Sequence, residues 1–192
     1  MAVLTVPECD SDDELAGFCD ALLGLLETRP KRVTFRFIGA HEMAPDPALL
    51  VYDILTTRGN GSQIVTEAWS PVLGSSVLVW LAGHVRRIRS TTHFHFRSLQ
   101  EITRRRRQHR PPWENHFEAL AGDAEPEANP WTTDYKKVLE LMDQYLPVDQ
   151  CIDKFMTPAM LNELGLLENS PLDNLMGRCL ARPAPDHYAQ DI

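Results

Sequence analysis

The chain has 192 residues, of which 43% are hydrophobic and 24% are charged, and its formal net charge is −8 at pH 7. These values are typical of a soluble globular protein, and the length fits one domain over residues 1–192. The negative charge argues against nucleic acid as a partner, and no apolar run approaches the roughly 20 residues that a membrane-spanning helix needs.

The cysteines and the first residues bear on the cellular compartment. The four cysteines lie far apart, with no CxxC pair among them, so neither a disulfide framework nor a zinc site is expected. The opening residues, MAVLTVPECDSDDE, lack the positive and apolar regions of a signal peptide. We therefore expect a cytoplasmic protein with reduced thiols, no metal and no other cofactor.

The first half of the chain alternates between helix and strand patterns. Ser11 followed by Glu14 is a capping box, and apolar residues at helical spacing then predict a helix over 12–27. Residues 33–38 (VTFRFI) predict a short strand that enters a loop. A proline in the first turn and an acidic N-cap predict a second helix, with Asp46 as N-cap and Pro47 as its first residue.

The central part contains the most conspicuous pattern of the chain. A strand is predicted at 63–67, and the apolar segment 77–82 predicts a buried helix that small residues lead into. A short basic strand follows. In the next strand, His93, His95 and Arg97 alternate with phenylalanines, so these three side chains point to one face. We expect this face to line a ligand groove or an interface.

The C-terminal part is less regular. Residues 99–132, which include the basic run Arg104–Arg110 and an acidic, proline-containing stretch, predict an exposed arm or insertion. A helix is predicted at 133–145, and Thr157 caps a further short helix that begins with a proline. The tail 171–192 is predicted to be flexible. The alternation of helices and strands predicts an α/β fold.

Four segments, in this order, resemble the Clp protease proteolytic subunit (ClpP) and the wider ClpP/crotonase superfamily. They are ELAGFCDALLGLLETRPKRVTFRFIG, FIGAHEMAPDPALLVYDIL, SPVLGSSVLVWLAGHVRR, and the pair DKFMT and ELGL near the end. The resemblance implies stacked ββα units, with small, mostly parallel sheets flanked by helices. It also implies self-assembly, because family members form rings of six or seven subunits or stacked trimers.

The resemblance also assigns positions to the family's catalytic parts, which are a Ser-His-Asp triad and an oxyanion hole of backbone N–H groups. The hole falls on Glu42-Met43, the nucleophile on Gly74, the general base on Arg97 and the acidic member on Asp153. Glycine has no nucleophile, arginine stays protonated, and a glutamate opposes a developing oxyanion. This pattern implies a catalytically degenerate protein, a pseudoprotease that acts as a structural, regulatory or interaction subunit.

A shifted triad is the alternative. Ser75 and Ser76 adjoin the nucleophile position, and His95 shares a strand face with the residue at the base position. Ser75 or Ser76 with His95 and Asp153 would form an active serine peptidase. Acyl-CoA chemistry of the crotonase type is more remote, since it also needs an open oxyanion hole. The expected partners are further copies of this chain or an active ClpP-like paralogue, without a membrane.

Overall fold

The computed structural model describes residues 2–9, 11–59, 61–101 and 130–167. The labelled strands and helices of these residues are, in chain order, β1 (Ala2–Val6), α1 (Asp12–Glu27), β2 (Arg32–Phe37), β3 (His41–Met43), α2 (Pro45–Arg58), β4 (Gln63–Ala68), β5 (Val72–Gly74), α3 (Ser76–Leu81), β6 (Val85–Ile88), β7 (Phe94–His95), α6 (Pro130–Met142), α7 (Val148–Cys151), β8 (Phe155–Met156) and α8 (Pro158–Glu163). The expected α/β architecture is confirmed.

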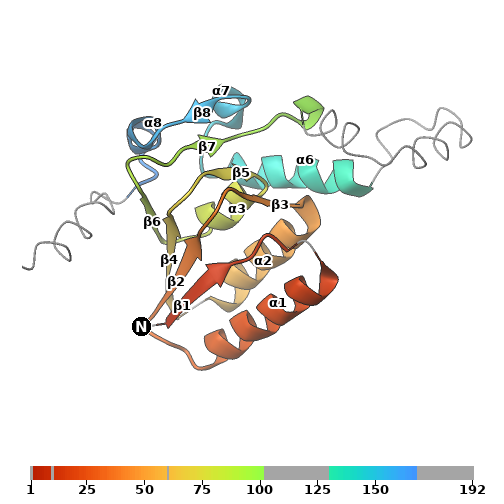
Figure 1. Ribbon diagram of the computed structural model, residues 1–192, viewed down its shortest axis with the longest axis vertical. Coiled ribbons are helices and arrows are strands. Elements are labelled where there is room, and N and C mark those ends of the chain that lie inside the picture. Colours follow the sequence, from red (N-terminus) through yellow and green to blue (C-terminus); the bar gives the residue numbers. More distant parts are fainter. Residues whose placement is uncertain (1, 10, 60, 102–129, 168–192) are drawn as a thin grey trace, which may run out of the picture.

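The strands form two four-stranded sheets. Sheet A has the order β1-β2-β4-β6 and is parallel throughout. Sheet B has the order β3-β5-β7-β8 and is parallel except for the last pair. Successive strands enter different sheets: β2 joins sheet A, β3 joins sheet B, and α2 follows. The same step repeats with β4, β5 and α3, so the expected stacked ββα units are confirmed (Figure 1).

One face of sheet A carries much of the apolar core. Alternate residues of β2, namely Val33, Phe35 and Phe37, are fully buried, and α1 and α2 lie on the same side of the sheet (Figure 1). Each buried phenylalanine contributes about 1.5–3 kcal/mol relative to an exposed one. The predicted helix at 12–27 is confirmed, since the Glu14 N–H donates to Ser11 Oγ at 3.2 Å.

The predicted start of the second helix was wrong. The helix begins at Pro45 with Ala44 as N-cap, and no side chain caps it, whereas Asp46 lies within its first turn. The segment expected to be a loop contains β3, which runs through Met43 and leaves only one residue before the helix. Pro45 supports a helix start as well as Pro47 does, because either proline has the φ angle of a first turn.

The strand expected around residues 93–97 is shorter than predicted. The strand β7 covers Phe94–His95, and Phe96 forms one isolated bridge to Ile152. β1, β5, α7 and β8 were not predicted. The strands β5 and β8 have three and two residues, too few to show a two-residue period. The five residues of β1, AVLTV, do not alternate between apolar and polar, and α7 is a single turn of four residues.

Two of the C-terminal helices were predicted: α6 (Pro130–Met142) lies three residues earlier at each end than the expected 133–145, so residues 130–132 are helical and not part of an arm, and α8 begins as expected. The Thr157 hydroxyl accepts the Met160 N–H at the start of α8, and Gly165 ends this region with a φ of +69°. The greater part of the predicted arm (102–129, including the basic run) and the predicted tail 171–192 lie outside the described residues. Within the described ranges, no helix is long and apolar enough to cross a bilayer.

Candidate functional site

The two faces of sheet B differ in chemistry. Because neighbouring strands are paired in register, one residue from each strand lies in a row across the sheet. One row is buried and consists of His41, Val72, Phe94 and Met156. The adjacent row lies on the opposite face, because strand side chains alternate, and consists of Glu42, Leu73, His95 and Phe155. This second face carries the charged residues of the candidate site.

Arg97 connects two parts of this face. Its Nη1 donates to Glu42 Oε1, and the exposed fraction of the Arg97 side chain is 5%, against 38% for Glu42. The backbone carbonyl of Arg97 accepts a 2.7 Å hydrogen bond from the buried Tyr135 hydroxyl on α6. Arg97 is therefore held both by its side chain and by its main chain.

His95 lies between Arg97 and two carboxylates. Arg97 Nε donates to His95 Nδ1 at 3.4 Å, so a neutral ring carries its proton on Nε2. His95 Nε2 lies 3.7 Å from Glu101 Oε2. The ring stacks on Phe155 at 4.3 Å between centroids, and His93 contacts the same phenylalanine edge-on at 5.4 Å. The structure confirms that His95 and Arg97 share a face.

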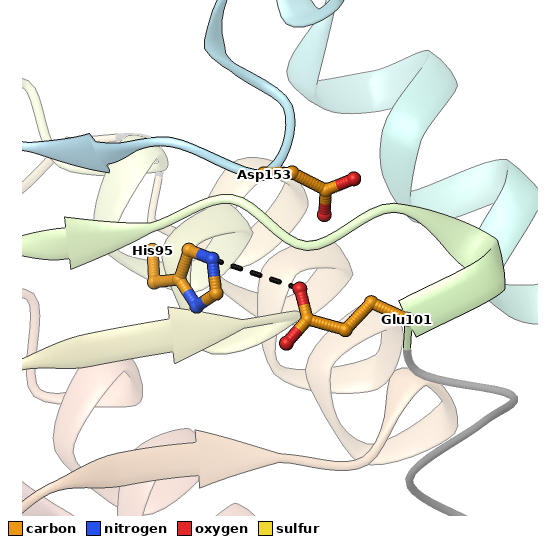
Figure 2. A group of neighbouring side chains, drawn as sticks. All are labelled: His95, Glu101 and Asp153. Atoms are coloured by element: carbon orange, nitrogen blue, oxygen red, sulfur yellow. Dashed lines mark ion pairs between the residues drawn. The ribbon is translucent and has the colours of Figure 1, made fainter.

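The start of a helix at residues 99–101 brings Glu101 to this site. Ser98 caps the helix, since the Glu101 N–H donates to Ser98 Oγ at 3.2 Å. In a capping box, the glutamate at this spacing usually accepts the N–H of the capping residue. Here Asp153 Oδ1 accepts the Ser98 N–H at 2.8 Å instead. The Glu101 carboxylate turns toward His95, as Figure 2 shows.

Asp153 lies in the segment between α7 and β8 and is the third titratable residue beside His95 and Glu101. Its backbone has a φ of +56°, and its N–H donates to the Phe96 carbonyl at 2.6 Å. Desolvation is the largest influence and raises the pKa of Asp153, but hydrogen bonds from Ser98, a hydrogen bond with the Glu101 side chain and the nearby His95 together lower it by more, so that the net pKa lies below its usual value. The ligand atoms of His95, Glu101 and Asp153 all lie within 4.8 Å of one another (Figure 2).

A second histidine, which sequence reasoning left aside, pairs with one of the candidate serines. His41 Nδ1 lies 2.8 Å from Ser76 Oγ, and His41 Nε2 lies 2.8 Å from the Pro7 carbonyl and 3.1 Å from that of Val6. Nε2 therefore carries the proton, and Ser76 donates to Nδ1. Ser76 Oγ also accepts the Met43 N–H at 2.7 Å. Both His41 and Ser76 are fully buried, so no substrate reaches this pair.

Comparisons with known proteins identify the fold. Neither a family model nor a curated protein matches the sequence. The ClpP protease catalytic domain from Plasmodium falciparum matches at 11% identity and a TM-score of 0.57, over 87% of this chain and 82% of that chain. ClpP1 from Listeria monocytogenes matches at 11% identity and a TM-score of 0.57, over 91% of this chain and 93% of that chain. This chain has the ClpP/crotonase fold.

The crotonase side of the fold is represented as well. A monofunctional enoyl-CoA isomerase from M. smegmatis matches at 14% identity and a TM-score of 0.53, over 93% of this chain and 77% of that chain. At these identities the matches concern the fold, and the chemistry depends on the residues present.

The positions that the ClpP resemblance assigns to catalysis can now be placed in the structure. Gly74, at the nucleophile position, ends β5 with a φ of +53°, a backbone conformation that favours glycine. Ser75 follows as the N-cap of α3, 2% exposed and without a side-chain capping bond. Glu42 and Arg97, at the hole and base positions, are bound to each other. Asp153 accepts from Ser98.

Sequence reasoning missed Glu101 as a member of the site and did not pair His41 with Ser76. Glu101 carried a signal, since Ser98 and Glu101 have capping-box spacing directly after a strand. His41 carried none, because its only prominent neighbours in the sequence are those of an apparent loop. The expectation of a metal-free protein rested on the absence of a cysteine pattern and on the weakness of the His93/His95 pair as a metal motif, and it did not weigh a site made of one histidine and two carboxylates.

Proposed function

We propose that this chain is a non-catalytic protein of the ClpP/crotonase fold that acts as a structural, regulatory or interaction subunit. The Glu42–Arg97 ion pair is the observation that carries the proposal. It joins the residue at the oxyanion-hole position to the residue at the general-base position. A guanidinium stays protonated at any usable pH, and this one is neutralised by a carboxylate, so it neither accepts a proton nor stabilises an oxyanion.

The hydrogen bond that the Met43 N–H already makes supports the same proposal. An oxyanion hole needs backbone N–H donors that point to where negative charge develops. The Met43 N–H, at the second position of the expected hole, already donates to the buried Ser76 hydroxyl at 2.7 Å. A donor in this state does not bind a peptide oxyanion. The same limit applies to the thioester oxygen of an acyl-CoA.

The alternative is a peptidase with Ser75 or Ser76 as nucleophile and His95 as base. The hydrogen bond of Ser76 to His41 counts against its pairing with His95. Ser75 is then the remaining candidate nucleophile, but its exposed fraction of 2% counts against attack on a peptide. The proton assigned to His95 Nε2 also leaves that nitrogen without a free lone pair for a serine hydroxyl.

Fluorophosphonate labelling tests the proposal directly. The folded parent chain is incubated with the probe beside an active ClpP as positive control, and the labelled fraction is measured by intact mass. We expect no labelled fraction. Labelling of the parent that disappears in Ser75→Ala or in Ser76→Ala, with each variant still folded by circular dichroism, would establish an active serine and refute the proposal.

Self-association or association with an active ClpP-like subunit is the role that we propose for the chain. Large apolar side chains are exposed at the edges of both sheets, Val3 on β1 at 40% and Phe155 on β8 at 61%. Sedimentation velocity at micromolar concentration should show assemblies of several chains, alone or with such a subunit. A chain that stays monomeric in both experiments would contradict this role.

A further inference from the structure

The cluster of His95, Glu101 and Asp153 has the composition of a metal site. One imidazole and two carboxylates are ligands that borderline divalent ions such as Zn²⁺ accept. Glu101 and Asp153 come from segments about 50 residues apart, the helix start at 99–101 and the turn before β8, and Glu101 is the one turned toward the histidine (Figure 2). The exposed fractions of the His95 and Glu101 side chains are 6% and 16%, whereas Asp153 is exposed, so the cluster is open to solvent on the Asp153 side only.

The distances are close to those of a bound ion. Bonds of about 2.0–2.2 Å in a tetrahedral site place neighbouring ligand atoms about 3.3–3.6 Å apart. His95 Nε2 and Glu101 Oε2 are already 3.7 Å apart, and all three ligand atoms lie within 4.8 Å of one another. The widest gap is at most 4.8 Å, so closing it takes a shift of at most about 1.5 Å. A water molecule would complete four-coordination.

The charges and the hydrogen bonds favour a cation. The positive charge of Arg97 is matched by Glu42, so the two carboxyl groups of the cluster face a single imidazole, and binding of a cation releases the proton of the hydrogen bond between them. Those carboxylates are turned to one place because Asp153 takes the capping contact that Glu101 would otherwise make. We propose that His95 Nε2, Glu101 and Asp153 bind one divalent transition-metal ion of the Zn²⁺ type.

Arg97 acts against the ion in this site. A metal on Nε2 requires the ring proton on Nδ1, and metal-bound histidines usually donate that proton to an acceptor. Arg97 Nε instead donates to Nδ1, at 3.4 Å. Binding therefore breaks this long contact, and Arg97 weakens the affinity. The proposal does not depend on whether the chain has peptidase activity, and it predicts that removing Arg97 strengthens metal binding.

The test uses the full chain without a metal-binding tag, stripped of metal with a chelator. Calorimetric titration with Zn²⁺ should show one saturable site per chain, and Co²⁺ should give the visible absorption of a four- or five-coordinate ion with nitrogen and oxygen ligands. Glu101→Gln and Asp153→Asn should each weaken binding at least about tenfold, because loss of even an outer-shell partner costs 10–100-fold. The matched control His93→Gln keeps the parent affinity.

The double variant Glu42→Gln/Arg97→Gln tests the predicted competition. Replacing both partners leaves no unpaired buried charge, so the fold is retained. We expect about tenfold tighter Zn²⁺ binding than in the parent. Zn²⁺ should also raise the melting temperature of the parent but not that of Glu101→Gln.

Two results would overturn the proposal. One is the absence of a one-to-one site for both Zn²⁺ and Co²⁺ in the folded parent. The other is binding that Glu101→Gln and Asp153→Asn leave unchanged, which would place the ion on other histidines or cysteines of the chain. Since both variants alter the outer part of the cluster, the test does not rely on replacing the buried His95.

Discussion

The buried Ser76 hydroxyl offers a quantitative test of how α3 is held to β3. Ser76→Ala removes an oxygen that accepts the Met43 N–H at 2.7 Å and donates to His41 Nδ1 at 2.8 Å. Both partners are buried, so water does not replace the lost bonds without a rearrangement. An unsatisfied buried polar group costs about 1–3 kcal/mol. Two such groups, offset in part by no longer burying the hydroxyl, give an expected loss of about 2–4 kcal/mol.

Urea unfolding followed by circular dichroism measures this loss. The free energy of unfolding should fall by about 2–4 kcal/mol at an unchanged m-value, and the melting temperature by about 5–15 °C, which follows from the entropy of unfolding of a chain of this size. The matched control is Ser75→Ala, the adjacent buried serine without a side-chain capping bond, which should cost less than about 1 kcal/mol. In a double-mutant cycle with His41→Leu, the coupling should be about 0.5–3 kcal/mol. Equal costs for the two serine variants, or no coupling, would refute the reasoning.

Two further pairs of substitutions test the backbone. Gly83→Ala should destabilise the fold by about 1–3 kcal/mol, because the added Cβ would lie 2.3 Å from Thr66 Oγ1. By contrast, Gly17→Ala should stabilise the fold by about 0.5–1 kcal/mol, because Gly17 lies at an exposed helix position with open space around it. Thermal unfolding measures whether each variant is less or more stable than the parent. A change of the same sign in both variants would contradict the argument from the space around each glycine. Asp153→Ala should cost about 1–2 kcal/mol more than Asp153→Asn, since asparagine tolerates the positive φ and still accepts the Ser98 N–H. Equal stabilities of these two variants would show that neither the positive φ of residue 153 nor the bond from the Ser98 N–H contributes to stability.

The parts of the fold that could be predicted from the sequence are those in which local signals agree. The helix at 12–27 has a capping box, acidic residues in its first turn and an apolar stripe, and its bounds match the structure. The strand expected at 33–38 agrees within one residue at each end, since it is six residues long and rich in β-branched and aromatic side chains. By contrast, β3 and β7 contain three and two residues, and only their pairing in sheet B defines them.

The candidate site shows the same division. The shared face of His95 and Arg97 follows from strand alternation and was predicted. The ion pair of Arg97 with Glu42 joins residues 55 positions apart, and it depends on the register of β3, β5 and β7. The orientation of Glu101 depends on Asp153, which displaces the usual capping contact. No local pattern encodes contacts of this kind.

The strand order of sheet A has a consequence for folding kinetics. The strands lie side by side in the order in which they occur in the chain, and the pairs Ala2 with Val33 and Arg32 with Gln63 each close a loop of about 30 residues. Each new strand therefore has its partner already formed on one side, and the sheet grows in one direction as the chain lengthens. Because β2 and β4 are paired on both sides and β1 and β6 on one side only, native-state hydrogen exchange should show protection decreasing from β2 and β4 toward the outer strands β1 and β6.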